Sequence, residues 1–225
     1  MKLVVHFLLW CIILCLCSPM QGLFNNPTRP KIIMINPAGD AKHTGRKLTN
    51  NYERAIAMKL ADSLAKAVEN RYGMKVLITR APGDELIHLQ NASFANRVNV
   101  DFFININIYK EDHEKPRLYL FHRMLDPLAD LARRTYPLLE LASVNTAHMR
   151  NIHKTKSFGE RIKMVMTQQD YQNLFDFSGV HGLPIKPLEG IVAPAVLFDI
   201  GLNDEERWPM FVEPITASLK FLLDY

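Results

Sequence analysis

The sequence predicts an α/β fold in three layers, with a mostly parallel, twisted sheet that has helices on both faces. Short apolar runs of strand length recur along the chain, and segments with helical periodicity separate them. Glycine and proline mark many of the boundaries between these segments. In sheets of this kind, ligands bind beyond the carboxyl ends of the strands. The polar residues that follow the predicted strands are therefore the candidates for a functional site.

The N-terminal segment precedes this fold and has the layout of an export signal. Lys2 is followed by an almost wholly apolar run over residues 3–16, and small or polar residues come next. This pattern is typical of a secretory signal peptide, and an uncleaved N-terminal anchor is the main alternative. Cys17 also ends a segment that weakly resembles a lipoprotein cleavage box. We therefore expect residues 1–22 to be a signal peptide or anchor and residues 23–30 to be a linker.

The rest of the chain, residues 31–225, has the composition of one globular domain. The protein has 225 residues, of which 48% are hydrophobic and 22% are charged, so a conventional core is expected. All the cysteines lie in the export segment, which leaves the domain without disulfides or thiolate metal ligands. These features fit an exported protein of the periplasm or cell envelope of a bacterium. The net charge of +4 is too small and too dispersed to indicate binding to nucleic acid.

The domain is predicted to begin with a strand and a long helix. An apolar run over residues 31–36 predicts a buried strand, and a polar loop over residues 38–51 follows it. The next segment repeats apolar residues at a spacing of four, which predicts a helix. These apolar positions are Ile56, Leu60, Leu64 and Val68. Asn50 or Asn51 is expected to cap the start of this helix, and Gly73 is expected to end it.

The middle of the chain continues the alternation of strands and helices. Residues 74–79 form the second predicted strand, and residues 80–84 form a turn rich in turn-forming residues. Residues 88–98 have the pattern of a short helix. Residues 100–108 predict a third strand, whose far end alternates asparagine with isoleucine. Residues 118–122 predict a fourth strand.

The C-terminal part supplies one more strong strand and several helical segments. Residues 126–146 and 156–175 have helical patterns, although the stretch 147–190 is the least regular of the chain. Residues 194–200 form a strongly apolar strand that ends at a glycine. Residues 205–224 predict a closing helical segment that is interrupted by its prolines. There is no internal repeat and no sign of a second domain.

A series of short motifs along residues 31–225 lies at the predicted strand ends and helix starts. In chain order they are Asn36-Pro37-Ala38-Gly39-Asp40-Ala41, Glu53-Arg54, Leu77-Ile-Thr-Arg80, Ala95-Asn96, Asp101-Phe-Phe-Ile-Asn-Ile-Asn107 and Pro194-Ala-Val-Leu-Phe-Asp199-Ile-Gly201-Leu202. Their order and spacing resemble those of the zinc-dependent N-acetylmuramoyl-L-alanine amidases. These enzymes cut the amide bond between the glycan and the stem peptide of peptidoglycan. The resemblance is strongest over residues 31–109 and 193–206, and it implies the same α/β fold.

The resemblance also implies a zinc site that this chain has largely lost. The family's two ligand histidines fall at the positions of Gly39 and Asn107, and its ligand glutamate falls at Glu53. The family's catalytic glutamate falls at Asp199. A catalytic zinc needs three good protein ligands and an open position for water. We therefore expect no cofactor, and zinc only in the case that the protein is an active enzyme.

Two further hypotheses concern the same strand ends. His43 lies in the loop that follows the position of the first lost ligand and is a candidate for a substitute zinc ligand. Asp40 is expected to lie near Glu53, Asn107 and Asp199. Such a cluster of oxygen atoms is of the kind that Ca²⁺ or Mg²⁺ prefers, so the second hypothesis is a site for one of these ions.

The sequence leaves three hypotheses for the function. The leading one is an amidase-like cell-envelope protein, non-catalytic or impaired, that binds peptidoglycan, a muropeptide or an envelope protein. The alternatives are a divergent active amidase with relocated metal ligands and a structural component of an envelope complex. Arg80 and Asn96 are expected to line the cleft as packing and hydrogen-bonding residues. Membrane contact is expected only through an uncleaved or lipidated N-terminus.

Overall fold

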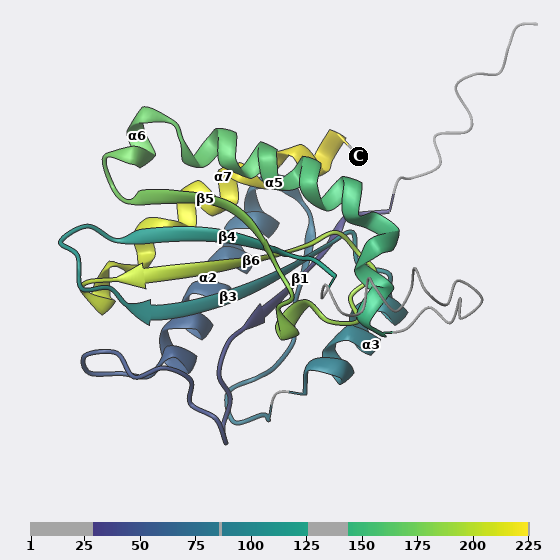
Figure 1. Ribbon diagram of the computed structural model, residues 1–225, viewed down its shortest axis with the longest axis horizontal. Helices are drawn as coiled ribbons and strands as arrows, with labels where there is room; N and C mark the ends of the chain where they lie inside the picture. Colours follow the sequence, from purple (N-terminus) through teal and green to yellow (C-terminus); the bar gives the residue numbers. More distant parts are fainter. Residues whose placement is uncertain (1–28, 86, 126–143, 225) are drawn as a thin grey trace, which may run out of the picture.

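The computed structural model describes residues 29–85, 87–125 and 144–224 (Figure 1). The predicted export segment and most of the predicted helix at 126–146 lie outside the described residues. Among the described helices, none combines the length and the apolar character that crossing a membrane requires.

The centre of the molecule is a six-stranded sheet in the order β2-β1-β3-β6-β4-β5. The strands are β1 Ile32–Pro37, β2 Lys75–Ile78, β3 Phe102–Lys110, β4 Arg117–Arg123, β5 Asp176–Leu183 and β6 Ala195–Leu202. The first four in this order are mutually parallel, whereas β4 runs antiparallel to β6 and β5 runs parallel to β4. This arrangement confirms the predicted mostly parallel sheet.

Helices cover both faces of the sheet, as predicted. Helices α2 (Glu53–Tyr72), α5 (Ile152–Met166) and α7 (Val212–Ser218) supply buried residues to the larger core cluster on one face. Helix α3 (His88–Val98) and the turn η2 (Lys186–Leu188) pack on the other face with a smaller cluster. The two faces differ because successive side chains of a strand point to opposite sides of the sheet.

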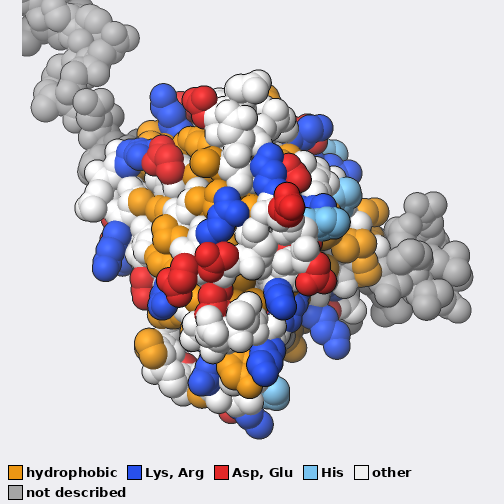
Figure 2. All heavy atoms as spheres, turned by 90° about the vertical axis from the view of Figure 1, so that its left-hand side faces the viewer, with side chains coloured by type: hydrophobic (Ala, Val, Ile, Leu, Met, Phe, Trp, Pro, Cys, Tyr) orange, Lys and Arg blue, Asp and Glu red, His pale blue; other side chains and the backbone are white. Residues whose placement is uncertain are grey.

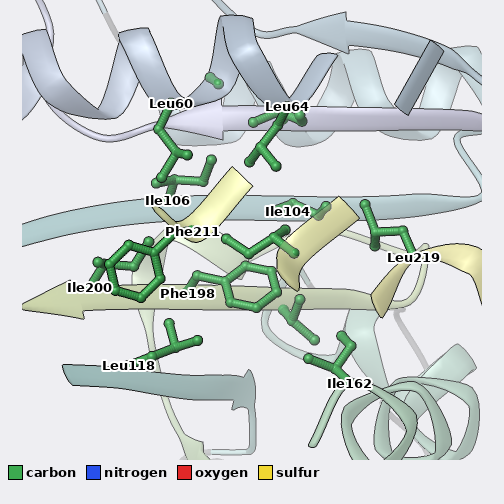
Figure 3. Packing of buried hydrophobic residues seen from close by; sticks show 14 of the residues in the cluster. Leu60, Leu64, Ile104, Ile106, Leu118, Ile162, Phe198, Ile200, Phe211 and Leu219 are labelled. Carbon is green, nitrogen blue, oxygen red and sulfur yellow. The ribbon is translucent and has the colours of Figure 1, made fainter. Parts of the chain in front are cut away.

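The larger core is built from the even-numbered side of β3 and β6 (Figure 3). Ile104 and Ile106 of β3 and Phe198 of β6 are fully buried. Leu60 and Leu64 of α2 lie over them, which is the consequence of the apolar spacing of four in the sequence. Burial of large apolar side chains on this scale is the main favourable term in folding. It fixes the sheet as a rigid frame for the residues at its edges.

Helix α2 ends where the sequence predicted, but its start is different. The N–H of Gly73 donates to the carbonyl oxygen of Glu69 at 3.0 Å and closes the helix. The residue before the first turn is Tyr52, which makes no side-chain cap. Asn50 and Asn51 do not cap the helix. Both donate instead to the buried carboxylate of Glu205, far along the chain.

The irregular stretch before β6 departs from the sequence prediction. Residues 156–175 do not form one helix: α5 ends at Met166, a single turn follows at Gln169–Gln172 (α6), and the chain then enters β5. Strand β5 was not predicted. A short 3₁₀ segment, η1 (Val144–Asn151), precedes α5. The closing segment divides into η3 (Glu205–Phe211), α7 and η4 (Lys220–Asp224), with prolines in η3 and in the first turn of α7.

Candidate functional site

The site lies where the carboxyl ends of β3 and β6 extend beyond the end of β1. The last residue of β1, Pro37, pairs with Ile106, whereas β3 continues to Lys110 beside β6. Asn107 and Asp199 are direct neighbours across β3 and β6, so the sheet brings together two of the predicted site positions. We call Arg46, Glu53, Asn107, Tyr109 and Asp199 the carboxyl-edge cluster.

Glu53, the retained ligand position, is bonded to the backbone. The part of β3 that extends beyond β1 has an N–H group at Ile108 that no longer faces a β1 carbonyl, and Glu53 Oε1 accepts from it at 2.9 Å. Glu53 Oε2 accepts from the N–H of Arg46 at 2.9 Å. The residue is only 4% exposed. Buried peptide N–H groups need such acceptors, so the carboxylate completes the edge of the sheet.

The loop before α2 is shaped so that it can approach this carboxylate. Gly45 has a φ of +77°, and a Cβ atom there would lie 2.7 Å from Glu53 Oε2. A larger residue would therefore collide with the carboxylate as well as suffer backbone strain. The close approach of the loop places the next residue, Arg46, at the carboxyl edge.

Arg46 lies between the two carboxylates of the cluster. Its Nη1 donates to Asp199 Oδ1 at 2.9 Å, and its Nε is 3.9 Å from Glu53 Oε2. The guanidinium also lies over the ring of Tyr109, 5.5 Å from its centroid. Burial raises the pKa of Asp199, and Arg46 offsets part of that rise by attracting the carboxylate. Arg46 is thus a fixed positive charge at the place where the resemblance expects a metal.

Asn107 is tied into a row of side-chain amides across β1 and β3. The amides of Asn105 and Asn107 are 2.7 Å apart, and those of Asn36 and Asn105 are 2.6 Å apart. The hydroxyl of Thr79 and the amide of Asn91 also contact the Asn36 amide, at 2.6 and 3.1 Å. Asn36 and Asn105 are each 1% exposed. This network satisfies polar groups on the α3 face of the sheet and accounts for the alternation of asparagine and isoleucine in β3.

Gly39, where the resemblance expects a ligand histidine, has no room for a side chain in this backbone. Gly39 has a φ of +72°, and a Cβ atom there would lie 2.7 Å from the Cβ of Arg54. The guanidinium of Arg54 reinforces this loop by donating to the carbonyl oxygens of Asp40 and Ala41. The loop is therefore folded for glycine at this position.

His43 and Asp40 interact with each other within the loop that follows β1. Asp40 Oδ1 accepts from the N–H of Lys42 at 2.8 Å and also from the N–H of His43. The His43 side chain is 72% exposed, and its Nδ1 is 3.6 Å from Asp40 Oδ1. The structure therefore gives Asp40 a local role in shaping the loop, and it does not bring His43 to Glu53.

Arg80 and Asn96 also have structural positions. Arg80 is buried and donates to the carbonyl oxygens of Pro37, Ala38 and Arg54 at 3.2 to 3.3 Å, which joins the end of β1 to the start of α2. Burial lowers the pKa of its guanidinium. The Asn96 amide donates to the carbonyl oxygen of Gly190 at 2.8 Å and lines a hollow beside the amino ends of the strands. The expectation that Asn96 lines the same cleft as Glu53 is therefore corrected.

These donors do not fit a zinc site. Glu53 has both carboxylate oxygens bonded to peptide N–H groups, Asn107 offers a neutral amide, and Gly39 offers no side chain. A metal ion bound here would also lie beside the positive charge of Arg46. In the described part of the chain, no group of three or more histidine, cysteine, aspartate or glutamate side chains has metal-binding geometry. Asp40, which was expected to join an oxygen cluster for Ca²⁺ or Mg²⁺, accepts hydrogen bonds from N–H groups of its own loop.

The surface at this edge carries both signs of charge (Figure 2). The view faces the side toward which β3 and β6 point in Figure 1, and acidic and basic side chains lie side by side on it. Such a surface does not favour a polyanion over other ligands. Recognition at this edge therefore depends on individual hydrogen-bonding groups.

Arg46 was not identified from the sequence. It lies in a polar loop, and no motif marks it. A signal was nevertheless present: Glu53 and Asp199 were expected close together without a full set of metal ligands, and two neighbouring carboxylates favour a compensating positive charge. The loop that precedes α2 was the nearest source of such a charge.

Comparisons with known proteins bear on the fold. No protein-family model matches the sequence, and no curated protein matches it. The catalytic domain of CwlV, an N-acetylmuramoyl-L-alanine amidase from Bacillus (Paenibacillus) polymyxa var. colistinus, has a TM-score of 0.62 and 16% identity, covering 86% of this chain and 98% of that one. An N-acetylmuramoyl-L-alanine amidase from Clostridium difficile 630 has a TM-score of 0.63 and 16% identity, covering 87% of this chain and 97% of that one.

A third solved structure agrees with these two. The N-acetylmuramoyl-L-alanine amidase AmiC2 of Nostoc punctiforme has a TM-score of 0.62 and 14% identity, covering 87% of this chain and 98% of that one. The matches span nearly the whole length of the other domains, so the likeness concerns a complete fold. The chain has the fold of N-acetylmuramoyl-L-alanine amidase catalytic domains.

Proposed function

We propose that this chain is an amidase-like protein of the bacterial cell envelope that binds peptidoglycan or a muropeptide at its carboxyl edge and does not hydrolyse it. The fold it shares with peptidoglycan amidases supports the class of ligand. The predicted export segment at residues 1–22 supports a location in the periplasm or envelope. Because fold alone does not define chemistry, the proposal depends on the site itself.

The observation that carries the proposal is the position of Arg46 between Glu53 and Asp199. A guanidinium supplies positive charge and directional N–H donors, and it does not titrate near neutral pH. Zinc in an amidase does something different: it binds water at an open coordination position and lowers the pKa of that water to about 7. Arg46 therefore retains the attraction of the site for carbonyl and carboxylate oxygens without a means of activating water.

The exposed part of the cluster suits a peptide ligand. The Arg46 side chain is 44% exposed, and Asn107 and Tyr109 are half-buried beside it. Guanidinium N–H groups remain to donate to a ligand carboxylate, and the Asn107 amide can pair with a peptide group. The stem peptide of a muropeptide presents both carboxylates and peptide groups.

Two measurements on the purified protein test the absence of hydrolysis. Intact sacculi are incubated with the protein, and soluble muropeptides are quantified by chromatography, while the metal content of protein prepared without chelator is measured. The proposal expects no release above the blank and no stoichiometric zinc. Release that disappears with chelator and with Glu53→Ala would instead identify a divergent amidase.

A binding assay tests the ligand. Co-sedimentation with sacculi is compared for the wild type, Arg46→Gln and Arg97→Gln, the last being an exposed arginine on α3 that serves as the matched control. We expect Arg46→Gln to weaken binding about tenfold, which corresponds to the loss of one charge-assisted hydrogen bond. The far-ultraviolet circular dichroism of each variant checks that it is folded. If no form of the protein binds sacculi, the remaining hypothesis is a structural component of an envelope complex, for which cross-linking would identify partner proteins.

A further inference from the structure

A second hollow lies at the opposite edge of the sheet from the carboxyl-edge cluster. It has a volume of about 410 Å³ and is bordered by the amino ends of β1, β3 and β6 and by the start of α5. In Figure 1 this is the right-hand side of the molecule, where the chain enters β1 and where α5 begins. The charged residues that line it are Arg29, Lys31, Asp101, Arg150 and Lys154. We call it the amino-edge hollow.

Its charge is strongly unbalanced. Four cationic side chains line the hollow together with one carboxylate, which leaves a net charge of +3. That carboxylate, Asp101, already has partners. Its Oδ1 lies 3.2 Å from Nη2 of Arg29 and 3.7 Å from Nζ of Lys31, and its Oδ2 accepts from the N–H of Ile32 at 2.9 Å. Asp101 therefore orders the first two cations and has no capacity left for the other two.

Arg150 and Lys154 are the unneutralised pair. They are four residues apart on either side of the junction of η1 and α5, both are exposed, and both line the hollow. Within residues 29–85, 87–125 and 144–224, neither has an ion-pair partner. Two like charges that line one hollow repel each other, and an anion between them would remove that repulsion. The arrangement is thus more favourable with an anionic ligand than without one.

The wall of the hollow adds a second requirement. Phe158 of α5, Leu222 of η4 and Val100 before β3 also line it, but each is at most 5% exposed, so the apolar surface open to a ligand is small. A ligand that fills the hollow therefore combines an anionic group with a small apolar part. Arginine and lysine together, with many N–H donors, suit a group with several anionic oxygens, and phosphate presents more of them than a carboxylate does.

We propose that the amino-edge hollow is a binding site for a phosphate-bearing ligand with a short apolar portion, such as a glycerophosphate unit. Arg150 and Lys154 bind the phosphate, Arg29 and Lys31 complete the positive rim, and the glycerol or acyl carbons lie against Phe158. This site is independent of the proposed peptidoglycan function, because it lies at the other end of the strands and shares no residue with the carboxyl-edge cluster.

The test is isothermal titration calorimetry on the full chain in a buffer free of phosphate. The probes are sn-glycerol 3-phosphate, short-chain dihexanoyl phosphatidylglycerol below its micellar concentration, and dihexanoyl phosphatidylcholine under the same conditions. The variant Arg150→Gln/Lys154→Gln removes the unneutralised pair. The matched control, Lys59→Gln/Lys66→Gln, removes the same charge from exposed positions on α2.

We expect the wild type and the control to bind an anionic probe with affinities within about twofold, and the Arg150→Gln/Lys154→Gln variant to bind it at least tenfold more weakly. Binding of glycerol phosphate indicates a free phosphate ligand, and binding of phosphatidylglycerol alone indicates a lipid headgroup. Either pattern supports the site. Equal weakening in the control would overturn the proposal, as would equal binding of phosphatidylcholine or no binding of any probe.

Discussion

Glu53 is held by the backbone on both sides of its carboxylate, through the N–H groups of Arg46 and Ile108. A residue that serves as an acceptor for two buried peptide groups contributes to stability whether or not the site binds a ligand. The same position in a metal site would instead point its oxygens at the ion. The stability of a conservative variant therefore distinguishes these two roles.

We expect Glu53→Gln to lower the free energy of unfolding by about 1–3 kcal/mol, because the amide NH₂ would face an N–H donor and leave it unsatisfied. Urea unfolding followed by circular dichroism measures this change. Glu160→Gln, on the exposed surface of α5, is the control and should stay within about 0.5 kcal/mol of the wild type. An unchanged stability for Glu53→Gln would contradict the structural role.

His148 in η1 is a buried residue outside both sites. It is 5% exposed, and within the described residues neither ring nitrogen has a partner with good hydrogen-bond geometry. Burial, together with the positive charge of the nearby Arg123, lowers the pKa of this imidazole from 6.5 to about 4. The unfolded chain therefore binds a proton at a higher pH than the folded chain. The contribution of the neutral His148 to the free energy of unfolding is fully present above pH 6.5 and is lost as the pH falls toward 4.

The variant His148→Leu should remove this dependence. We expect the difference in unfolding free energy between wild type and variant to change by roughly 3 kcal/mol between pH 7 and pH 4, in favour of the variant at the lower pH. Urea titrations at several pH values provide the data, and the exposed His153→Leu is the control. Parallel stability curves for wild type and His148→Leu would show that another group governs the acid response.

At the scale of elements, the loop between β1 and α2 is fastened to the C-terminal part of the chain. The buried Glu205, at the start of η3, accepts from the N–H groups of Asn50 and Asn51 at 3.1 and 3.2 Å and from the Asn51 amide at 2.8 Å. Burial alone would raise the pKa of Glu205, but these hydrogen bonds outweigh it and hold the pKa below its usual range. The carboxylate thus fixes the end of the loop that carries Arg46.

Removing this attachment should loosen the loop and leave the sheet intact. In Glu205→Ala we expect the amides of residues 46–51 to exchange on the order of tenfold faster, while those of β3 are unaffected. Hydrogen exchange read by mass spectrometry resolves the two regions. Glu206→Ala changes the exposed neighbour and should leave both rates as they are. Faster exchange in β3 as well would mean that Glu205 supports the whole fold.

At the scale of the molecule, the strands differ in how they are supported. β6 is paired on both sides, with β3 and β4, and all of its residues except Asp199 are buried. Among the described strands, β5 is at the edge and pairs with β4 alone, and all of its residues are half-buried or exposed. Local opening is therefore easier at β5 than at the centre.

We expect the amides of β6 to be protected on the order of a hundredfold more strongly than those of β5 in native-state exchange. Nuclear magnetic resonance of the folded protein in deuterated buffer would measure individual amides. Comparable protection in the two strands would indicate that β5 is covered by another part of the chain or by a second copy.

The elements predicted from the sequence are those with a strong apolar pattern. β1, β3, β6 and α2 have long apolar runs or a regular spacing, and each was placed to within a few residues. β5 was missed because Asp176–Leu183 contains two glycines and a histidine and lies at the edge, where no alternation is enforced. The reversed direction of β4 relative to β6 depends on packing and could not be predicted from local patterns.

The site was predictable to the extent that strand ends determine it. Asn107 and Asp199 were expected together because both end parallel strands, and they are direct neighbours. The loop residues were not predictable, because loop conformation depends on contacts with distant residues. Arg46 is placed by Gly45 and Glu205, which are far apart in sequence, and Asp40 is turned away by bonds within its own loop.

The backbone at Gly39 has a consequence for the evolution of this protein. Under the proposed function, a return to zinc chemistry needs a histidine there, yet the left-handed φ and the contact with Arg54 oppose any side chain. Asn107→His alone would add one imidazole beside a guanidinium. The conformation of this loop therefore favours glycine at position 39 and opposes a metal-binding side chain there.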